Sequence, residues 1–181
     1  MVKKKDYRDK EGILNSVYPP ERYLTNGPWI YMVPQFKPKS VLMLGYAGGT
    51  TAGLIRMIYG DVPITAIDIE QCQILYKNVD FMVGDAKDVI KKCHGFDVII
   101  VDLLCSGHNA YDFILGKEFV SDLAKAGNYI IINTLNEPDL SEYKKAFNKY
   151  GHNKPNRLSN LIYYFGNGNH PDPILRGGQQ L

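Results

Sequence analysis

The chain has 181 residues and a formal net charge of +2, with 45% hydrophobic and 22% charged residues. This length and composition are those of a soluble globular protein and argue against two domains. No apolar run is long enough to span a bilayer, the N-terminus lacks a secretory apolar region, and the small net charge is no strong signal for nucleic acid. We therefore expect a cytoplasmic protein with no membrane partner.

Proline interrupts the first 39 residues. Five prolines stand at positions 19, 20, 28, 34 and 38. Because proline lacks a main-chain N–H group, this segment cannot hold a long helix or a central strand. We predict that residues 1–39 form a short helical or looped lid on the remainder of the chain.

Apolar runs and helix-like segments alternate from residue 40 onward. The predicted strands cover roughly residues 40–45, 63–68, 79–83, 97–102 and 128–134. The predicted helices cover roughly residues 50–59, 70–77, 86–93, 112–125 and 139–150. This alternation indicates repeated βαβ units with right-handed crossovers, and therefore an α/β fold with a doubly wound, mostly parallel sheet.

The last predicted helix, 139–150, carries Tyr143, Phe147 and Tyr150 at helical spacing, and we expect these aromatic side chains in the core. A short return from this helix would let the apolar run 161–165 join the sheet antiparallel. The main domain is thus expected to cover residues 40–166. The remaining residues, 167–181, are expected to form an irregular tail.

The most informative stretch is an apolar strand that runs into a turn of small residues, Val41-Leu42-Met43-Leu44-Gly45-Tyr46-Ala47-Gly48-Gly49-Thr50-Thr51. Small residues let the main chain approach a ligand closely, and Asp68 ends the next strand, where an acid can accept both hydroxyls of a ribose. Together these features indicate a cofactor that contains a nucleoside. The turn alone also fits a strand-to-helix connection that binds nothing, because Ala47 and Thr50 stand where a dinucleotide fingerprint has glycine.

Two more predicted strands end on acids. Gly84-Asp85-Ala86 closes the short run 81–83, and Asp102 ends the run 96–102. In an open α/β sheet, ligands lie beyond the carboxyl ends of the strands. We therefore expect Asp68, Asp85 and Asp102 to converge on one crevice.

The cysteines and histidines do not indicate a metal site. Three cysteines lack the CxxC spacing of a zinc site, and an odd number gives no disulfide framework. The four histidines are scattered along the chain. No metal is therefore expected.

The order of these motifs resembles the class I S-adenosylmethionine-dependent methyltransferase fold, and within it most closely the spermidine synthase-like branch. The resemblance covers roughly residues 40–165. Many methyltransferases carry an acid two places before the first glycine of the turn, whereas Met43 stands there in this chain, and the branch also lacks that acid. Further downstream, five residues follow the spacing of the branch: Gly107, Phe119, Leu123, Gly127 and Asn133.

The resemblance implies S-adenosylmethionine as the cofactor. The turn would pass close to the amino-acid portion and ribose of the cofactor through Gly45, Tyr46, Gly48 and Gly49, with the ring of Tyr46 as a cover. Asp68 would bind the ribose hydroxyls, Asp85 would accept from the adenine amino group, and Ala86 would lie against the adenine ring. Asp102 would sit beside the sulfonium and the incoming nucleophile, where a carboxylate is favoured by charge pairing.

One position departs from the aminopropyltransferases of this branch. They place a second aspartate three residues after the position of Asp102, where it helps to bind and deprotonate the amine, and this sequence has Cys105 there. A thiol is mostly neutral at pH 7 and does not hold a polyamine cation as a carboxylate does. The segment before residue 40 also differs from their N-terminal β-domain, because it is short and rich in proline.

Methyl transfer to a small-molecule acceptor is therefore the function that we favour. An activated sulfonium requires chiefly in-line positioning of the acceptor and exclusion of water. Asp102 and His108 are the candidate catalytic residues, the histidine as a base near neutral pH. Asn109, Tyr111 and Asn133 are candidates for lining the acceptor side.

Two alternatives stay open. The chain could be an aminopropyltransferase with altered amine specificity that uses decarboxylated S-adenosylmethionine, or a non-catalytic module that retains the cofactor crevice. An NAD-dependent dehydrogenase ranks lower, because Gly84-Asp85-Ala86 has no role in such an enzyme. A chain without the β-domain could also cover its open side with a second copy of itself, which leaves a homo-oligomer open.

Overall fold

The computed structural model describes residues 5–8, 12, 14–20, 27–72, 76, 78–105, 108–109, 112–135, 137–153 and 160–167. The strands of its central sheet are β3 (Val41–Leu44), β4 (Ile64–Asp68), β5 (Asp80–Val83), β6 (Phe96–Val101), β9 (Gly127–Thr134), β10 (Lys149–Asn153) and β11 (Leu161–Gly166). These seven strands lie in the order β10-β11-β9-β6-β3-β4-β5. The five from β5 to β9 run parallel, β11 is antiparallel to β9, and β10 is antiparallel to β11. The prediction of a doubly wound, mostly parallel sheet with an antiparallel C-terminal strand is confirmed.

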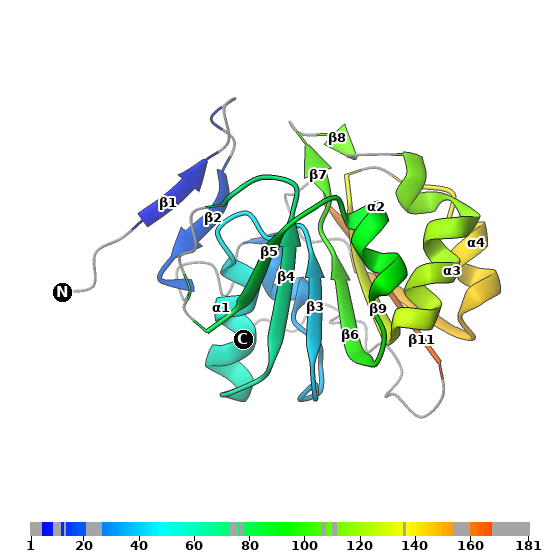
Figure 1. The fold of residues 1–181 in the computed structure, drawn as a ribbon, viewed down its shortest axis with the longest axis horizontal. Coiled ribbons are helices and arrows are strands. Elements are labelled where there is room, and N and C mark those ends of the chain that lie inside the picture. Colours follow the sequence, from blue (N-terminus) through cyan, green and yellow to red (C-terminus); the bar gives the residue numbers. More distant parts are fainter. Residues whose placement is uncertain are drawn as a thin grey trace.

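Helices cover both faces of this sheet (Figure 1). They are the 3-10 helices η2 (Pro28–Met32), η3 (Ile90–Lys92) and η4 (Asp112–Leu115) and the α-helices α1 (Thr50–Tyr59), α2 (Ala86–Val89), α3 (Lys117–Ala126) and α4 (Ser141–Ala146). α1 and η2 lie on one face, and α2, η3, α3 and α4 lie on the other. The domain therefore has three layers.

Strand β3 shows why the sheet is buried on both sides. Val41 and Met43 pack in the core on the α1 face, whereas Leu42 and Leu44 pack in the core on the α3 face. All four side chains are at most 2% exposed. A parallel strand that is covered on both faces is apolar at every position. This packing holds the carboxyl ends of β3, β4 and β6 in place relative to one another.

Two hairpins lie outside the central sheet. β1 (Lys5–Arg8) and β2 (Leu14–Tyr18) pair antiparallel, as do the two-residue strands β7 (Leu104–Cys105) and β8 (His108–Asn109). In Figure 1 the β7–β8 hairpin stands above the arrowhead of β6, and the β1–β2 hairpin lies beside the opposite half of the sheet. The N-terminal segment was predicted as a helical or looped lid; the structure instead has a hairpin followed by η2.

The connection between β4 and β5 differs from the predicted helix at 70–77. Its described residues, 69–72, 76 and 78–79, are not helical. The side chains of Cys72 and Tyr76 instead turn into the core, where the Tyr76 hydroxyl donates to the Val17 carbonyl at 2.8 Å.

The predicted helix at 139–150 is also corrected. α4 ends at Ala146, and residues 149–153 form β10, which pairs with β11. Tyr143 and Phe147 are buried as expected, but Tyr150 is 59% exposed because it lies on this edge strand. Among the described helices, none is long and apolar enough to cross a membrane.

Candidate functional site

Asp68 joins the end of β4 to the glycine turn that follows β3. Its Oδ2 accepts the main-chain N–H groups of Tyr46 at 2.8 Å and Ala47 at 2.9 Å, and its Oδ1 accepts that of Glu70 at 3.3 Å. The Cys72 thiol is also hydrogen-bonded to Asp68, so the carboxylate, which offers about four acceptor positions, has four donors, and a ribose hydroxyl that binds here would replace the weakest of them, the thiol. The acid that the sequence singled out therefore lies at the turn and also shapes it.

The first glycine of the turn brings β3 and β6 into main-chain contact. Gly45 has a φ of 84°, and a Cβ at this position would lie 2.2 Å from the carbonyl oxygen of Asp102. The Asp102 N–H donates to the carbonyl of Leu44 at 2.8 Å. Only glycine combines this conformation with this approach. Asp68 and Asp102 are thus brought to either side of the same turn.

The second half of the turn is covered by the N-terminal hairpin. Gly48 and Gly49 are buried, whereas Gly45 and Ala47 are half-buried. The Gly48 N–H donates to the hydroxyl of Ser16 on β2 at 2.9 Å. Of the predicted cofactor-binding glycines, Gly45 is therefore the one with main chain open to solvent.

Tyr46 contributes its main chain to the site, while its ring lies in the core. The side chain is 3% exposed and packs against Phe81 with ring centroids 5.5 Å apart. It also fills the space beside Gly49, where a Cβ would lie 2.2 Å from the Tyr46 hydroxyl. Burial raises the pKa of this hydroxyl to about 12. The Tyr46 ring is therefore packed in the core behind the glycine turn, and not on the side of the turn where a cofactor would bind.

Asp85 and Ala86 follow β5 at the same edge of the sheet. Asp85 is exposed and caps α2, with its Oδ1 accepting the Lys87 N–H at 2.8 Å. Ala86 is 7% exposed. The Gly84 N–H donates to the main-chain carbonyl of Asp68 at 2.8 Å, which joins the two acidic segments. Asp68 thus ends one strand and Asp85 follows the neighbouring strand, and the convergence of their carboxylates on one crevice stays a prediction.

Exposed apolar side chains lie beside Asp68 and Asp85. Ile69 is 59%, Val83 54% and Met82 42% exposed, and Val83 is the Cα partner of Asp68 across β4 and β5. Large apolar side chains left open to solvent beside one another are typical of an interaction surface. Sequence reasoning missed them, although an apolar residue directly after a strand-end acid was a usable signal.

Asp102 lies on the other side of the turn, where Asn133 holds its carboxylate and Asn160 in turn holds Asn133. Its Oδ1 accepts from Asn133 Nδ2 at 2.8 Å, and Asn133 Oδ1 accepts from Asn160 Nδ2 at 2.9 Å. The pKa of Asp102 is raised to about 6: desolvation raises it, the hydrogen bond from Asn133 lowers it, and the charge of Asp68 raises it. Asn133 was expected near the acceptor side, whereas Asn160 was not identified from the sequence.

The remaining candidates lie in or beside the β7–β8 hairpin. Cys105 and His108 are Cα partners there, and Asn109 pairs with Leu104. For these residues the structure describes the main chain alone, and Tyr111 lies outside the described residues. The role of His108 as a base therefore stays a prediction.

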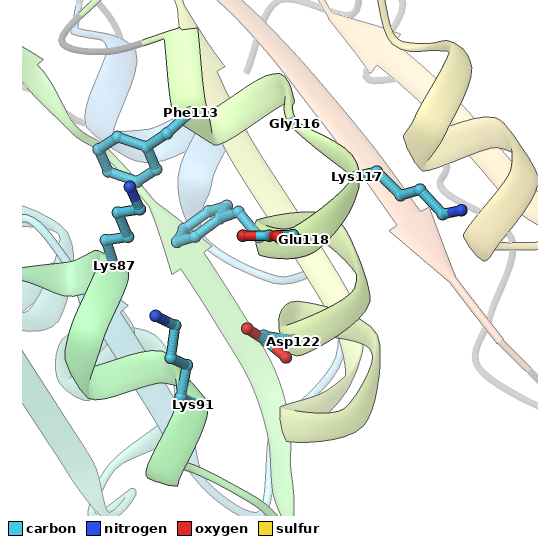
Figure 2. A pocket seen from close by; sticks show the side chains of 8 residues that line it. Lys87, Lys91, Phe113, Gly116, Lys117, Glu118 and Asp122 are labelled. Carbon is cyan, nitrogen blue, oxygen red and sulfur yellow. The ribbon is translucent and has the colours of Figure 1, made fainter.

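A separate cavity of about 230 Å³ opens between α2–η3 and α3 (Figure 2). Its lining includes Phe113 and Phe119, whose ring centroids are 5.1 Å apart, and Lys87 Nζ lies 5.9 Å from the Phe113 centroid. Figure 2 shows Lys117 pointing away from it. None of the predicted site residues lines this cavity. Within the described parts of the chain, no group of three or more His, Cys, Asp or Glu side chains could hold a metal ion.

Solved structures share this fold. Human methyltransferase-like protein 13 in complex with SAH matches with a TM-score of 0.64 and 14% identity, over 80% of this chain and 81% of that chain. A probable spermidine synthase from Corynebacterium glutamicum matches with a TM-score of 0.65 and 17% identity, over 86% and 70% of the two chains. Spermidine synthase from Thermotoga maritima matches with a TM-score of 0.57 and 16% identity, over 90% and 65%. No family model matches the sequence, and no curated protein matches it.

The chain therefore has the α/β fold of S-adenosylmethionine-dependent methyltransferases and spermidine synthases, as the sequence motifs led us to expect. At these levels of identity the likeness defines the fold. The reaction depends on the residues at the carboxyl ends of the strands.

Proposed function

We propose that this chain binds S-adenosylmethionine beyond the carboxyl ends of β3 to β6 and transfers its methyl group to a small-molecule acceptor. The observation that carries the proposal is the double hydrogen bond from the glycine turn to Asp68 Oδ2. It places a carboxylate beside a main chain that has no side chain at Gly45. This is the combination that a ribose requires.

The surrounding residues fit the other parts of an adenosyl group. Ile69 and Val83 are exposed apolar side chains on the Asp68 side, of the size to cover a purine ring. Asp85 is exposed at the start of α2 and has a second carboxylate oxygen, Oδ2, to accept from an exocyclic amine. These contacts support a nucleoside in an extended pose from Gly45 toward Asp85.

S-adenosylmethionine supplies, when bound, a methyl group activated by a sulfonium. Asp102 is the residue of this chain that we place beside that group, because it lies across Gly45 from Asp68. Its carboxylate is ionised above about pH 6, which lets it pair with a cationic acceptor or accept a proton from a neutral one. Asn133 fixes the orientation of the carboxylate, and Asn160 fixes Asn133.

Aminopropyl transfer from decarboxylated S-adenosylmethionine is the second candidate. It is supported by the position of Asp102 and by the likeness to the two spermidine synthase structures. We rank it second because Cys105 stands where those enzymes, by resemblance, have their second aspartate.

Calorimetry with S-adenosylmethionine, its decarboxylated form, S-adenosylhomocysteine and NAD tests the proposal. Methyl transfer predicts that the two carboxylated adenosyl compounds bind more tightly than the decarboxylated one and that NAD does not bind. Preference for the decarboxylated compound would replace it with aminopropyl transfer. Tight binding without turnover over a broad panel of small acceptors would leave a cofactor-binding module.

A further inference from the structure

Three successive N–H groups of the glycine turn are held by two side chains from different parts of the chain. Those of Tyr46 and Ala47 donate to Asp68, and that of Gly48 donates to Ser16 at 2.9 Å. Asp68 lies at the open side of the turn, whereas Ser16 is 1% exposed and lies under the hairpin. The turn is therefore clamped from both sides.

The β1–β2 hairpin has further anchors around this point. The Val17 N–H donates to Thr50 Oγ1 at 2.7 Å, and the Thr50 hydroxyl in turn donates to the Val17 carbonyl at 3.2 Å. On the paired strand, Tyr7 is the Cα partner of Ser16, and its hydroxyl is hydrogen-bonded to the thiol of Cys72. The hairpin thus joins the turn after β3 to the segment that follows Asp68.

We propose that Ser16 is a positioning residue of the cofactor site. It acts through Gly48 to hold the glycine turn in the conformation in which the turn's N–H groups donate to Asp68. The inference rests on the proposed function, because the cofactor is what the shaped turn would receive. Ser16 itself is too deeply buried to contact a ligand. Its hydroxyl accepts the hydrogen bond of the Gly48 N–H. Because a buried N–H without a partner is costly, the loss of this bond would shift the turn away from the position in which it bonds to Asp68.

An alternative is that the contact between Ser16 and Gly48 holds the hairpin where it obstructs the cofactor site. In that case Ser16 would hold β2 over a surface that the cofactor needs, and loosening the hairpin would strengthen binding. The two ideas predict opposite signs for one substitution. The clamp on three consecutive N–H groups favours positioning, because the side of the turn that faces Asp68 stays half-open at Gly45 and Ala47.

The test compares Ser16→Ala with Thr50→Val in the full chain. Both remove a hydroxyl from the contact between the hairpin and the start of α1, but only Ser16→Ala leaves Gly48 without its acceptor. Amide hydrogen exchange without cofactor, thermal unfolding and calorimetry with S-adenosylmethionine are measured for each variant. Ser16→Thr, which keeps the hydroxyl, is the conservative comparison.

We expect Ser16→Ala to speed exchange of the Gly48 amide about tenfold and to weaken S-adenosylmethionine binding about five- to tenfold. Thr50→Val should lower the melting temperature about as much as Ser16→Ala does, yet change the affinity for S-adenosylmethionine less than about twofold. Ser16→Thr should restore slow exchange at Gly48.

Three results would overturn the inference. Unchanged exchange at Gly48 in Ser16→Ala means that the serine does not hold the turn. Tighter cofactor binding in Ser16→Ala means that the hairpin obstructs the site, and equal weakening by both variants means that hairpin docking alone matters. These failures are separate from that of the proposed function, which fails if the wild-type chain binds no adenosyl sulfonium compound.

Discussion

The carbonyl oxygen of Asp102 lies 2.2 Å from where a Cβ on Gly45 would be. The two residues directly follow the neighbouring parallel strands β3 and β6, and the Asp102 N–H donates to the carbonyl of Leu44, just before Gly45. Because there is no side chain between them, the glycine turn can approach the acidic end of β6. This close approach fixes the spacing between the glycine turn and the end of β6.

Gly45→Ala should therefore destabilise the protein by about 3 kcal/mol, from a positive φ and a main-chain clash together. Gly95→Ala is the matched control, because Gly95 has a φ of 79° but no atom within 4 Å of its Cβ position. It should cost about 1 kcal/mol. Urea unfolding measures both variants, and equal losses would show that the clash is relieved cheaply.

Asp68→Ala should weaken S-adenosylmethionine binding about 30-fold or more, since it removes a charged acceptor and releases two N–H groups of the turn. It should also lower the free energy of unfolding by about 1–2 kcal/mol, because the turn loses its partner. Asp61→Ala is the control: its carboxylate side chain is 96% exposed and pairs with Arg56. If calorimetry gives the same affinity for both variants, the ribose role of Asp68 is wrong.

Ile69→Ala should weaken cofactor binding about fivefold, because the exposed side chain would be covered by the purine ring only in the complex. The melting temperature should hardly change, since Ile69 is 59% exposed in the free protein. Ile58→Ala offers the same substitution on α1, at a side chain 43% exposed. Titration calorimetry on this pair should show a loss at Ile69 alone.

Asp102→Asn should lower turnover about 100-fold while leaving cofactor affinity within a few-fold. It should also stabilise the fold by the order of 1–2 kcal/mol at neutral pH. The folded-state pKa of about 6 lies above the ordinary 3.8, so the stability linked to this proton is complete below about pH 4 and is lost as pH rises through 6. Thermal unfolding should thus show a stability gain at neutral pH that vanishes near pH 4. A variant that binds no cofactor but keeps its residual rate would place Asp102 elsewhere.

Asn133→Leu should raise the pKa of Asp102 by about one unit, because it removes a hydrogen bond to the ionised carboxylate. The acidic limb of the pH–rate profile would then move toward neutral pH. Asn160→Ala leaves the bond between Asn133 and Asp102 in place and should give a smaller shift. Identical profiles for wild type and Asn133→Leu would show that Asp102 does not control the rate.

The sequence was sufficient for the features that depend on local pattern. The apolar strand before Gly45, and the acids at positions 68, 85 and 102, could be placed because parallel strands end at one edge of a sheet. The antiparallel direction of the run at 161–165 was predicted correctly, but from a short return out of a helix at 139–150, whereas β10 lies between α4 and β11. These signals depend on neighbours in the chain.

Contacts between distant segments could not be read in this way. Ser16 and Gly48 are 32 residues apart, and Asn160 meets Asn133 across 27. The exposure of Val83 depends on β5 being an edge strand, which spacing alone does not show. Tyr150 fitted a helical period, yet α4 ends at Ala146 and the residue lies on an edge strand.

The order in which the chain is synthesised gives the N-terminal hairpin a particular place in folding. Ser16 and Val17 leave the ribosome before Gly48 and Thr50, the residues to which they bond. The hairpin cannot therefore reach its final contacts during early synthesis, and its docking must follow the first β-strand and helix of the sheet. We expect protease resistance of residues 14–18 in stalled nascent chains to appear only once α1 has emerged.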